Sequence, residues 1–526
     1  MTTQFPKSKT QDVYHPFLWI VVAGVTALAD VLLYRSHGFA GPATFFPIAT
    51  IALLLAHKSS RDKPLQVSAA LCLILVMLLA LCLSMLWSGG PVQLLIAFWL
   101  MNAALMLAQG SIPFLLESFV FIAGVIPAGY DMLNGIEQTW REKVLAPVDR
   151  RQPGQSLTVA LPVISAFIFG IVFLLANPDL IGNVSRHLAD FLEAAGRFLW
   201  KFSFAEILFW GLVIWLTAGL LRPLVGSATE EQPSTGDDVD QPSPHPLFSA
   251  FRNTLITLIV MFAGYLSFEF RTLWFRVFPE GFHYSGYAHE GAAWLTVALA
   301  LATVMLSLIF RGAMLSDTRI GQLRRLAWIW SALNLLLAAS VYNRLWIYVG
   351  FNGMTRMRVV GLLGISAVVV GFVLVLIKIR RQKNFAWLIR RQLWVPGFAV
   401  YLMALMPVDL LAHRYNVTRI MNGSLAPSVQ ISEHPMSVDA LPQLLPLLEC
   451  EDTLIREGVQ SLLAERLNRL IAEEPNDRHW TSTQLGRERA IQALKSAVPD
   501  LLELGNSPSE LALKRQRFRE YAMQWW

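Results

Sequence analysis

The sequence is short of charged residues and of cysteine. Only 15% of its 526 residues are charged, whereas a soluble globular protein carries about 25%. This deficit, together with a hydrophobic content of 55%, excludes a soluble enzyme, a disordered protein and a fibrous protein. The three cysteines offer neither a disulfide framework nor a zinc spacing, because Cys72 and Cys82 would lie about 15 Å apart on one helix and Cys450 stands alone.

Familiar catalytic motifs are also missing. The sequence has no glycine-rich phosphate loop, no Ser–His–Asp signature, no kinase motif and no His-Glu-x-x-His zinc motif. We therefore expect no cofactor and no metal. The sequence does not indicate which residues would catalyse a reaction. The net charge of +6 arises mostly from basic residues in short loops between apolar runs, so we expect no nucleic-acid partner.

Long apolar runs make up most of the chain. A helix needs about 20 mostly apolar residues to cross some 30 Å of hydrocarbon. The runs predict an all-α fold, a polytopic transmembrane helical bundle of about 11 spans set in a lipid bilayer. They are Phe17–Tyr34, Phe39–Ala56, Gln66–Trp87, Pro91–Gln109, Leu157–Ala176, Phe204–Leu221, Asn253–Phe270, Gly291–Phe310, Leu326–Tyr342, Met357–Ile377 and Leu393–Ala412.

Basic loops predict how the chain is oriented, because Lys and Arg near span ends favour the cytoplasmic side. The three clusters share one side only if the apolar stretch Ile112–Tyr130 is interfacial or re-entrant rather than a further span. The sequence then predicts a multi-pass bacterial inner-membrane protein with a cytoplasmic N-terminus and an extracytoplasmic tail. The clusters are Lys58, Arg61 and Lys63; Arg311, Arg319, Arg324 and Arg325; and Lys378, Arg380, Arg381, Lys383, Arg390 and Arg391.

Composition divides the chain into two membrane halves, a linker and a tail. The linker is acidic and rich in Pro and Ser, so it cannot bury a core. The tail is expected to be a small helical domain, because Glu451–Ile471 has apolar residues at helical spacing and Ser507–Glu510 is a capping box. The parts are the N-terminal membrane half at residues 1–225, the linker at 226–247, the C-terminal membrane half at 248–412 and the tail at 413–526.

Polar residues at the outer ends of the C-terminal spans form a candidate site. Charged groups at that depth are costly unless they are paired or hydrated. Three arginines at this boundary also oppose the trend for basic residues to lie inside. The site combines the end of one span with the loop Phe282–Gly291 and the segment Asn343–Arg358. Its members are Glu269, Arg271, Tyr287, His289, Glu290, Arg344, Tyr348 and Arg356.

Several interpretations of this cluster stay open. His289 and Glu290 could act as an acid–base pair, or they could join His283 as metal ligands, although no zinc spacing is present. The arginines could bind lipid headgroups or an anionic ligand, or they could pair with Glu269 and Glu290. We favour salt bridges and interfacial aromatic residues that fix the helix ends. Asp409, near the end of the last span, is expected to pair with Arg414 or Arg344 rather than to carry protons.

The C-terminal half resembles a family of bacterial membrane proteins. The resemblance is carried by Tyr287–Gly291, by the run Arg344–Arg358 and, in the tail, by His413–Ile420 and Ser437–Pro442. These motifs look like domain of unknown function 4173, which is close to the 4153 group, although the family pattern has arginine where this chain has His289. The resemblance covers residues 250–450 and implies a multipass inner-membrane protein without implying a reaction.

Three classes of function remain open. The class we favour is a structural or regulatory membrane protein that binds a protein partner through its outward loops and tail. A transporter is the second, although most charges lie at span ends rather than along a path. The third is a membrane-embedded enzyme that acts on an anionic or lipid-linked substrate at the outer leaflet through Glu290, His289, Arg344 and Arg356. The sequence does not indicate an oligomeric state or whether the protein is an enzyme.

Overall fold

Helices account for the regular structure of the part of the chain that is described. A computed structural model describes residues 16–59, 69–144, 203–221, 247–271, 284–310, 314, 317–381, 383–473, 479–497 and 508–525. Within these ranges there is no strand, which confirms the expected all-α fold. The span expected at Leu157–Ala176 and nearly all of the expected linker lie outside the described residues.

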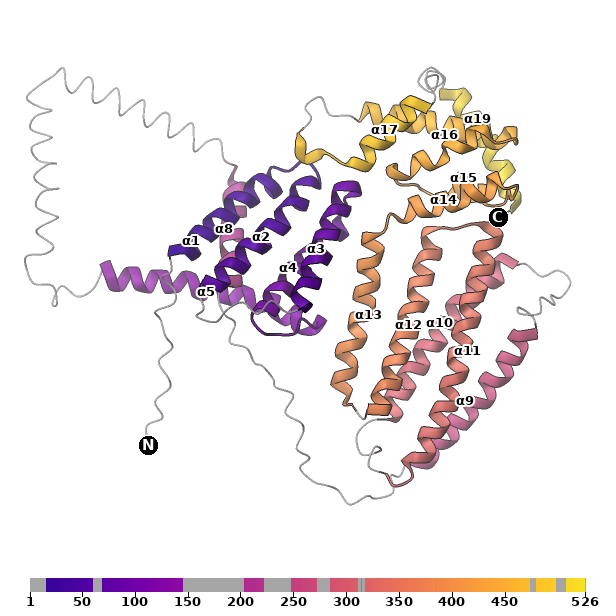
Figure 1. Cartoon of the computed structure of the whole chain (residues 1–526), viewed down its shortest axis with the longest axis horizontal. Coiled ribbons are helices and arrows are strands. Elements are labelled where there is room, and N and C mark those ends of the chain that lie inside the picture. Colours follow the sequence, from indigo (N-terminus) through magenta and orange to yellow (C-terminus); the bar gives the residue numbers. More distant parts are fainter. Residues whose placement is uncertain are drawn as a thin grey trace, which may run out of the picture.

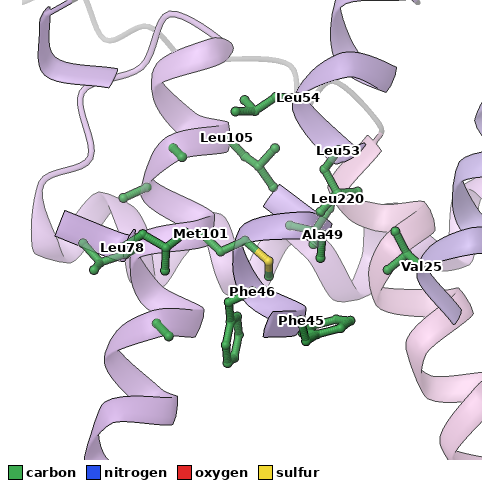
Figure 2. Close-up of a cluster of buried hydrophobic side chains, with 14 of the residues drawn as sticks. Val25, Phe45, Phe46, Ala49, Leu53, Leu54, Leu78, Met101, Leu105 and Leu220 are labelled. Carbon is green, nitrogen blue, oxygen red and sulfur yellow. The ribbon is translucent and has the colours of Figure 1, made fainter. Parts of the chain in front are cut away.

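The N-terminal bundle is built mostly from helices that are apolar on every side. In Figure 2, Phe46 and Leu53 of α2 pack among Leu78, Met101 and Leu105 of the neighbouring helices. The outward faces are apolar too, as expected for helices surrounded by lipid. The described helices are α1 (Pro16–Ala29), its π-helical continuation η2 (Asp30–Tyr34), α2 (Ala40–Ser59), α3 (Ala69–Ser88), α4 (Pro91–Ala108), α5 (Leu115–Val144) and α8 (Phe204–Leu221).

Helix α5 contains most of the ambiguous stretch Ile112–Tyr130. It lies crosswise at one end of the N-terminal bundle, whereas α2, α3 and α4 run side by side (Figure 1). The indole Nε1 of Trp215 in α8 donates to the carbonyl oxygen of Ile126 at 2.7 Å, so α5 packs closely on α8. The interfacial or re-entrant position expected for this stretch stays a prediction.

The C-terminal bundle contains α9 (Phe248–Glu269), α10 (Tyr284–Ile309), α11 (Ile320–Asn352), α12 (Arg356–Arg381) and α13 (Phe385–Leu405). Helix α13 also touches the N-terminal bundle. The Tyr401 hydroxyl donates to the carbonyl oxygen of Met77 at 3.0 Å, and Gln93 Nε2 donates to that of Ala404 at 2.9 Å. Helix α13 is therefore the seam between the two bundles.

Fewer helices than expected are long and apolar enough to cross a membrane. Among the described residues there are 7, or 8 if α13 and the helix after it count as one bent span. Helices α8 and α10 have shorter apolar stretches, namely Ala205–Leu221 and Val297–Ile309. The multipass character of the chain is thus established, while the number of about 11 spans stays a prediction.

The tail is a small helical domain that begins after a sharp bend. The chain turns by 66° between α13 and α14. Leu444, Val459, Leu463 and Phe518 form part of the buried tail core. The expected helix over Glu451–Ile471 is α16, and the last helix begins at Pro508 as its proline predicts. The elements are α14 (Val408–Met421), α15 (Ser428–Glu433), the 3₁₀ helix η6 (Val438–Glu449), α16 (Thr453–Ala472), η7 (Trp480–Ser482), α17 (Leu485–Ala497), α19 (Pro508–Ala522) and η8 (Met523–Trp525).

The tail lies across the ends of both bundles (Figure 1). On the N-terminal bundle, Trp87 Nε1 donates to Asp439 Oδ2 at 3.1 Å, and the His37 amide donates to Thr481 Oγ1 at 3.1 Å. On the C-terminal bundle, the side-chain amide of Asn416 donates to the carbonyl oxygen of Met354 at 2.9 Å. Because these bonds reach both bundles, the tail ties the two membrane halves together.

Gly353 provides a direct test of how the tail docks on the C-terminal bundle. Its φ is 89°, and an added Cβ would collide with Asn416 Oδ1 and lie 2.9 Å from Pro427 Cβ. Gly423 has a similar φ of 86° but open space around it. We expect Gly423→Ala to lose about 1–2 kcal/mol from the left-handed backbone alone, and Gly353→Ala to lose clearly more. Thermal unfolding of the purified protein measures both, and equal losses would contradict this packing.

Candidate functional site

The residues of the expected cluster lie on four helices. Glu269 ends α9, Arg344 and Tyr348 lie in α11, and Arg356 opens α12. Arg271 follows α9 and is exposed. The remaining members, Tyr287, His289 and Glu290, lie in the first turns of α10, and their side chains fall outside what the structure describes.

The loop expected at Phe282–Gly291 is instead helical from Tyr284 onward. The apolar run that we used to delimit the span begins only at Gly291. A helix can continue past the hydrocarbon into the polar boundary, since its backbone hydrogen bonds do not depend on apolar side chains. The expectation of a loop was therefore wrong, and His283 lies outside the described residues.

Glu269 and Arg344 form a buried ion pair between α9 and α11. Arg344 Nε donates to Glu269 Oε1 at 2.6 Å, and Arg344 Nη2 donates to Glu269 Oε2. The Tyr265 hydroxyl donates to Glu269 Oε2 at 2.9 Å and accepts from Arg344 Nη2 at 3.0 Å. Both charged side chains are almost fully buried, at 0% and 2% exposed. A two-pronged, hydrogen-bonded pair is the arrangement that makes burial of two charges tolerable.

A second ion pair joins α12 to the tail. Arg356 Nε donates to Asp409 Oδ1 at 2.6 Å, and Arg356 Nη2 donates to Asp409 Oδ2. The Ser437 amide adds a hydrogen bond to Asp409 Oδ2 at 2.7 Å. Asp409 therefore pairs with Arg356 and not, as we expected, with Arg414 or Arg344. The 66° bend before α14 explains the difference, because it carries Asp409 over the start of α12.

Tyr348 belongs to a third contact, with an arginine outside the expected cluster. The guanidinium carbon of Arg358 lies 3.9 Å from the centroid of the Tyr348 ring. Arg358 also donates to the carbonyl oxygen of Gly353, in the turn between α11 and α12. This cation–π contact and hydrogen bond fix the turn on which Asn416 of the tail docks.

The described part of the cluster thus separates into local contacts and does not form one open site. The Glu269 and Asp409 pairs share no hydrogen bond among the described residues. Within those residues there is also no group of three or more His, Cys, Asp or Glu side chains that could hold a metal ion. Sequence reasoning missed Tyr265 altogether. Asn416, Ser437 and Asp439 lie inside the tail motifs that carry the resemblance, but they were not assigned to the site.

A small cavity lies where the two bundles and the tail meet. Its volume is about 250 Å³. The turn between α3 and α4, the start of α12, the bend between α13 and α14, and the first part of η6 contribute to its wall. Its polar lining residues are Ser88, Gln93, Arg356, Asp409, Ser437 and Asp439.

Removing one partner of the buried pair distinguishes a clamp from a reactive site. We expect Arg344→Ala to lose about 3–5 kcal/mol, because Glu269 would be left buried without its guanidinium. The double variant Glu269→Gln/Arg344→Met removes both charges and should recover much of this loss. Folded yield and thermal unfolding in detergent measure the difference. Unchanged stability of Arg344→Ala would rule out the pair as a structural clamp, and a double variant no more stable than Arg344→Ala would show that lost contacts, rather than the unpaired charge of Glu269, cause the loss.

The tail should lose stability in acid through His434. Burial lowers the pKa of His434, and the charge of Arg358 lowers it further against the opposing charge of Glu433. The unfolded chain, with a histidine pKa of about 6.5, therefore binds more protons than the folded tail in acid. The free energy of unfolding therefore keeps its full value above about pH 6.5 and decreases as the pH falls below that value.

We accordingly expect His434→Gln to flatten the decline of the unfolding temperature between about pH 7 and pH 5. The measurement is a series of thermal unfolding curves for the wild type and the variant over this pH range. An unchanged slope would mean that other groups cause the decline.

Comparison with known proteins identifies a family. The family model described as Domain of unknown function (DUF4153) matches residues 45–447. No curated protein and no solved structure matches the chain. The match extends into the N-terminal bundle, well before the segment that carries the sequence resemblance, and it supports the 4153 group without confirming DUF4173. Because the match covers more than half of a chain rich in membrane-length apolar helices, the protein is an integral membrane protein that belongs to the DUF4153 family.

Proposed function

We propose that this membrane protein is a structural or regulatory platform that presents its C-terminal tail to a protein partner. The observation that carries the proposal is the way the tail is held. Polar contacts tie it to both bundles, through Trp87 and His37 on one side and through Asn416 and the Arg356–Asp409 pair on the other. A domain fixed at several points is suited to offering a defined surface, because little freedom remains to be lost on binding.

The proposed orientation places the tail outside the cytoplasm of a bacterial inner membrane. Lys378 Nζ donates to the carbonyl oxygen of Phe310 at 3.0 Å, and Arg390 pairs with Glu117 at 2.6 Å. These basic residues belong to the end of the C-terminal bundle that is remote from the tail (Figure 1). The tendency of basic residues to lie on the cytoplasmic side supports a cytoplasmic position for that end and for the N-terminus.

A groove on the tail supports a protein as the partner. It has a volume of about 710 Å³ and is lined by residues of α15, α16 and α19. Its rim carries the ion pairs Glu465–Arg515 and Glu433–Arg519. Its apolar lining residues are Leu462, Pro508, Leu511, Ala512 and Phe518. An apolar floor inside a rim of both charges suits a peptide segment with apolar anchors, since opposite charges on the rim give specificity and register.

The ion pairs count against an enzyme or transporter that uses Glu269, Arg344 or Arg356. A general acid or base must exchange a proton with a substrate, and a conducted ion needs a continuous hydrated path. Glu269 is fully buried against Arg344, and Arg356 is committed to Asp409 at the membrane boundary. These groups act more readily as clamps, which favours the structural or regulatory interpretation.

Charge reversal on the groove rim tests the partner surface. We expect Arg515→Glu to abolish the biological activity of the gene in a deletion strain while changing stability by about 1 kcal/mol or less, because the side chain is half exposed. Arg517→Glu is the matched control, since Arg517 is an exposed residue of the same helix and does not line the groove. The measurements are complementation and the amount of folded protein in the membrane.

Two outcomes would decide against the platform. Normal complementation by Arg515→Glu would remove the groove as the partner surface. Loss of complementation by Glu290→Gln, with folded protein at the wild-type amount, would favour a catalytic or transport role, because this change removes a charge from a residue of the expected acid–base pair while keeping its size.

A further inference from the structure

The cavity between the bundles and the tail lies at the ends of apolar helices, where lipid headgroups are expected to surround the protein. Helix α3 ends at Ser88, α4 begins at Pro91, α12 begins at Arg356 and α13 ends at Leu405, and all four ends border the cavity region. On the tail side, Ser437 and Asp439 complete the wall. A volume of about 250 Å³ is smaller than a typical drug-sized pocket, so it suits a small polar group rather than a whole lipid.

Asp439 is a buried carboxylate that lacks a counter-ion within hydrogen-bonding distance. It is 7% exposed, and Trp87 Nε1 donates to its Oδ2 at 3.1 Å. Its Oδ1 accepts no hydrogen bond from the described residues, and no ion pair joins it to a described cation. The oxygen is not one of the fully enclosed side-chain atoms that lack a partner, so it is accessible to a ligand that brings a cation.

Arg356 provides the complementary charge on the same wall. Its Nε and Nη2 are used by Asp409, but its Nη1 donates to no described residue, and its side chain is 52% exposed. Asp439 lines the same cavity but does not hydrogen-bond to Arg356. Arg356 Nη1 and Asp439 Oδ1 thus have no described partner, and the lining residues Arg356, Asp409 and Asp439 carry a total charge of −1.

From this arrangement we infer that the junction cavity binds a phosphoethanolamine group, with its ammonium on Asp439 Oδ1 and its phosphate on Arg356 Nη1. A primary ammonium donates hydrogen bonds and offsets the charge of Asp439, which has no described ion-pair partner. A guanidinium is the side chain best suited to a phosphate. The remaining wall includes Met403, Met406, Pro407 and Val408, which can contact the carbons of the group.

The same chemistry could come from a phosphatidylethanolamine lipid or from a soluble phosphoethanolamine compound. The position of the cavity at the ends of the spans favours the lipid. The inference does not depend on the tail groove proposed as the partner surface, because the two sites share no lining residue.

The experiment uses the purified full-length protein in detergent with added short-chain lipids. Binding is measured by native mass spectrometry and by the shift in unfolding temperature. We expect phosphatidylethanolamine to bind about tenfold more tightly than phosphatidylcholine, whose trimethylammonium cannot donate, and than phosphatidylglycerol, which has no ammonium. Glycerophosphoethanolamine distinguishes the two sources, since a soluble ligand would bind in its place without acyl chains.

Asp439→Asn tests the ammonium site. The asparagine can still accept from Trp87, so the fold should persist while affinity for phosphatidylethanolamine falls about tenfold and its preference over phosphatidylcholine disappears. Glu433→Gln is the control, because it removes a tail carboxylate that does not line the cavity. If Asp439→Asn does not fold, the comparison of the three lipids with the wild-type protein still decides the matter.

The inference is overturned if the wild type binds the three lipids equally, or if folded Asp439→Asn keeps the preference for phosphatidylethanolamine. If glycerophosphoethanolamine binds as tightly as the lipid, the cavity still recognises phosphoethanolamine, but its ligand is a soluble compound. Loss of the preference in Glu433→Gln as well would also reject the cavity as the binding site.

Discussion

Pairing of charges at the ends of apolar helices is the constraint on which this structure depends. An ionised side chain beside hydrocarbon is costly unless an opposite charge or water accompanies it. Glu269 meets Arg344 between α9 and α11, and Asp409 meets Arg356 between the tail and α12. Each pair joins elements distant in sequence, so satisfying the charges also fixes which helices are neighbours.

The two ion pairs have different structural roles because their side chains differ in solvent exposure. The Glu269–Arg344 pair is inside the C-terminal bundle, where the Tyr265 hydroxyl forms hydrogen bonds with both side chains. In the second pair, Asp409 is buried while Arg356 is half exposed and borders a cavity. The first arrangement holds a bundle together, whereas the second leaves part of a guanidinium accessible at the place where three units of the fold meet.

The sequence predicts the helices well, but it predicts the salt-bridge partners of the charged side chains less well. Apolar runs predict the described spans well, because every face of such a helix must suit either lipid or another apolar helix. Charge complementarity suggested salt bridges within the cluster without specifying the pairs, and Glu269 and Arg344 form one of them. The partner of Asp409 could not be read from spacing, since it depends on the 66° bend before α14. Nor could hydropathy show that α10 begins at Tyr284, because a helix continues where apolar side chains stop.

The contacts at the seam between the bundles are polar because lipid, and not water, surrounds the apolar helices. Lipid tails are as apolar as leucine, so apolar contact alone gives neighbouring helices little reason to associate. At the seam, Tyr401 donates to the backbone of α3, while Ser84 and Gln93 donate to the backbone at the end of α13. The tail then bonds to both bundles outside the spans. Together these directional contacts account for how two apolar halves keep one arrangement.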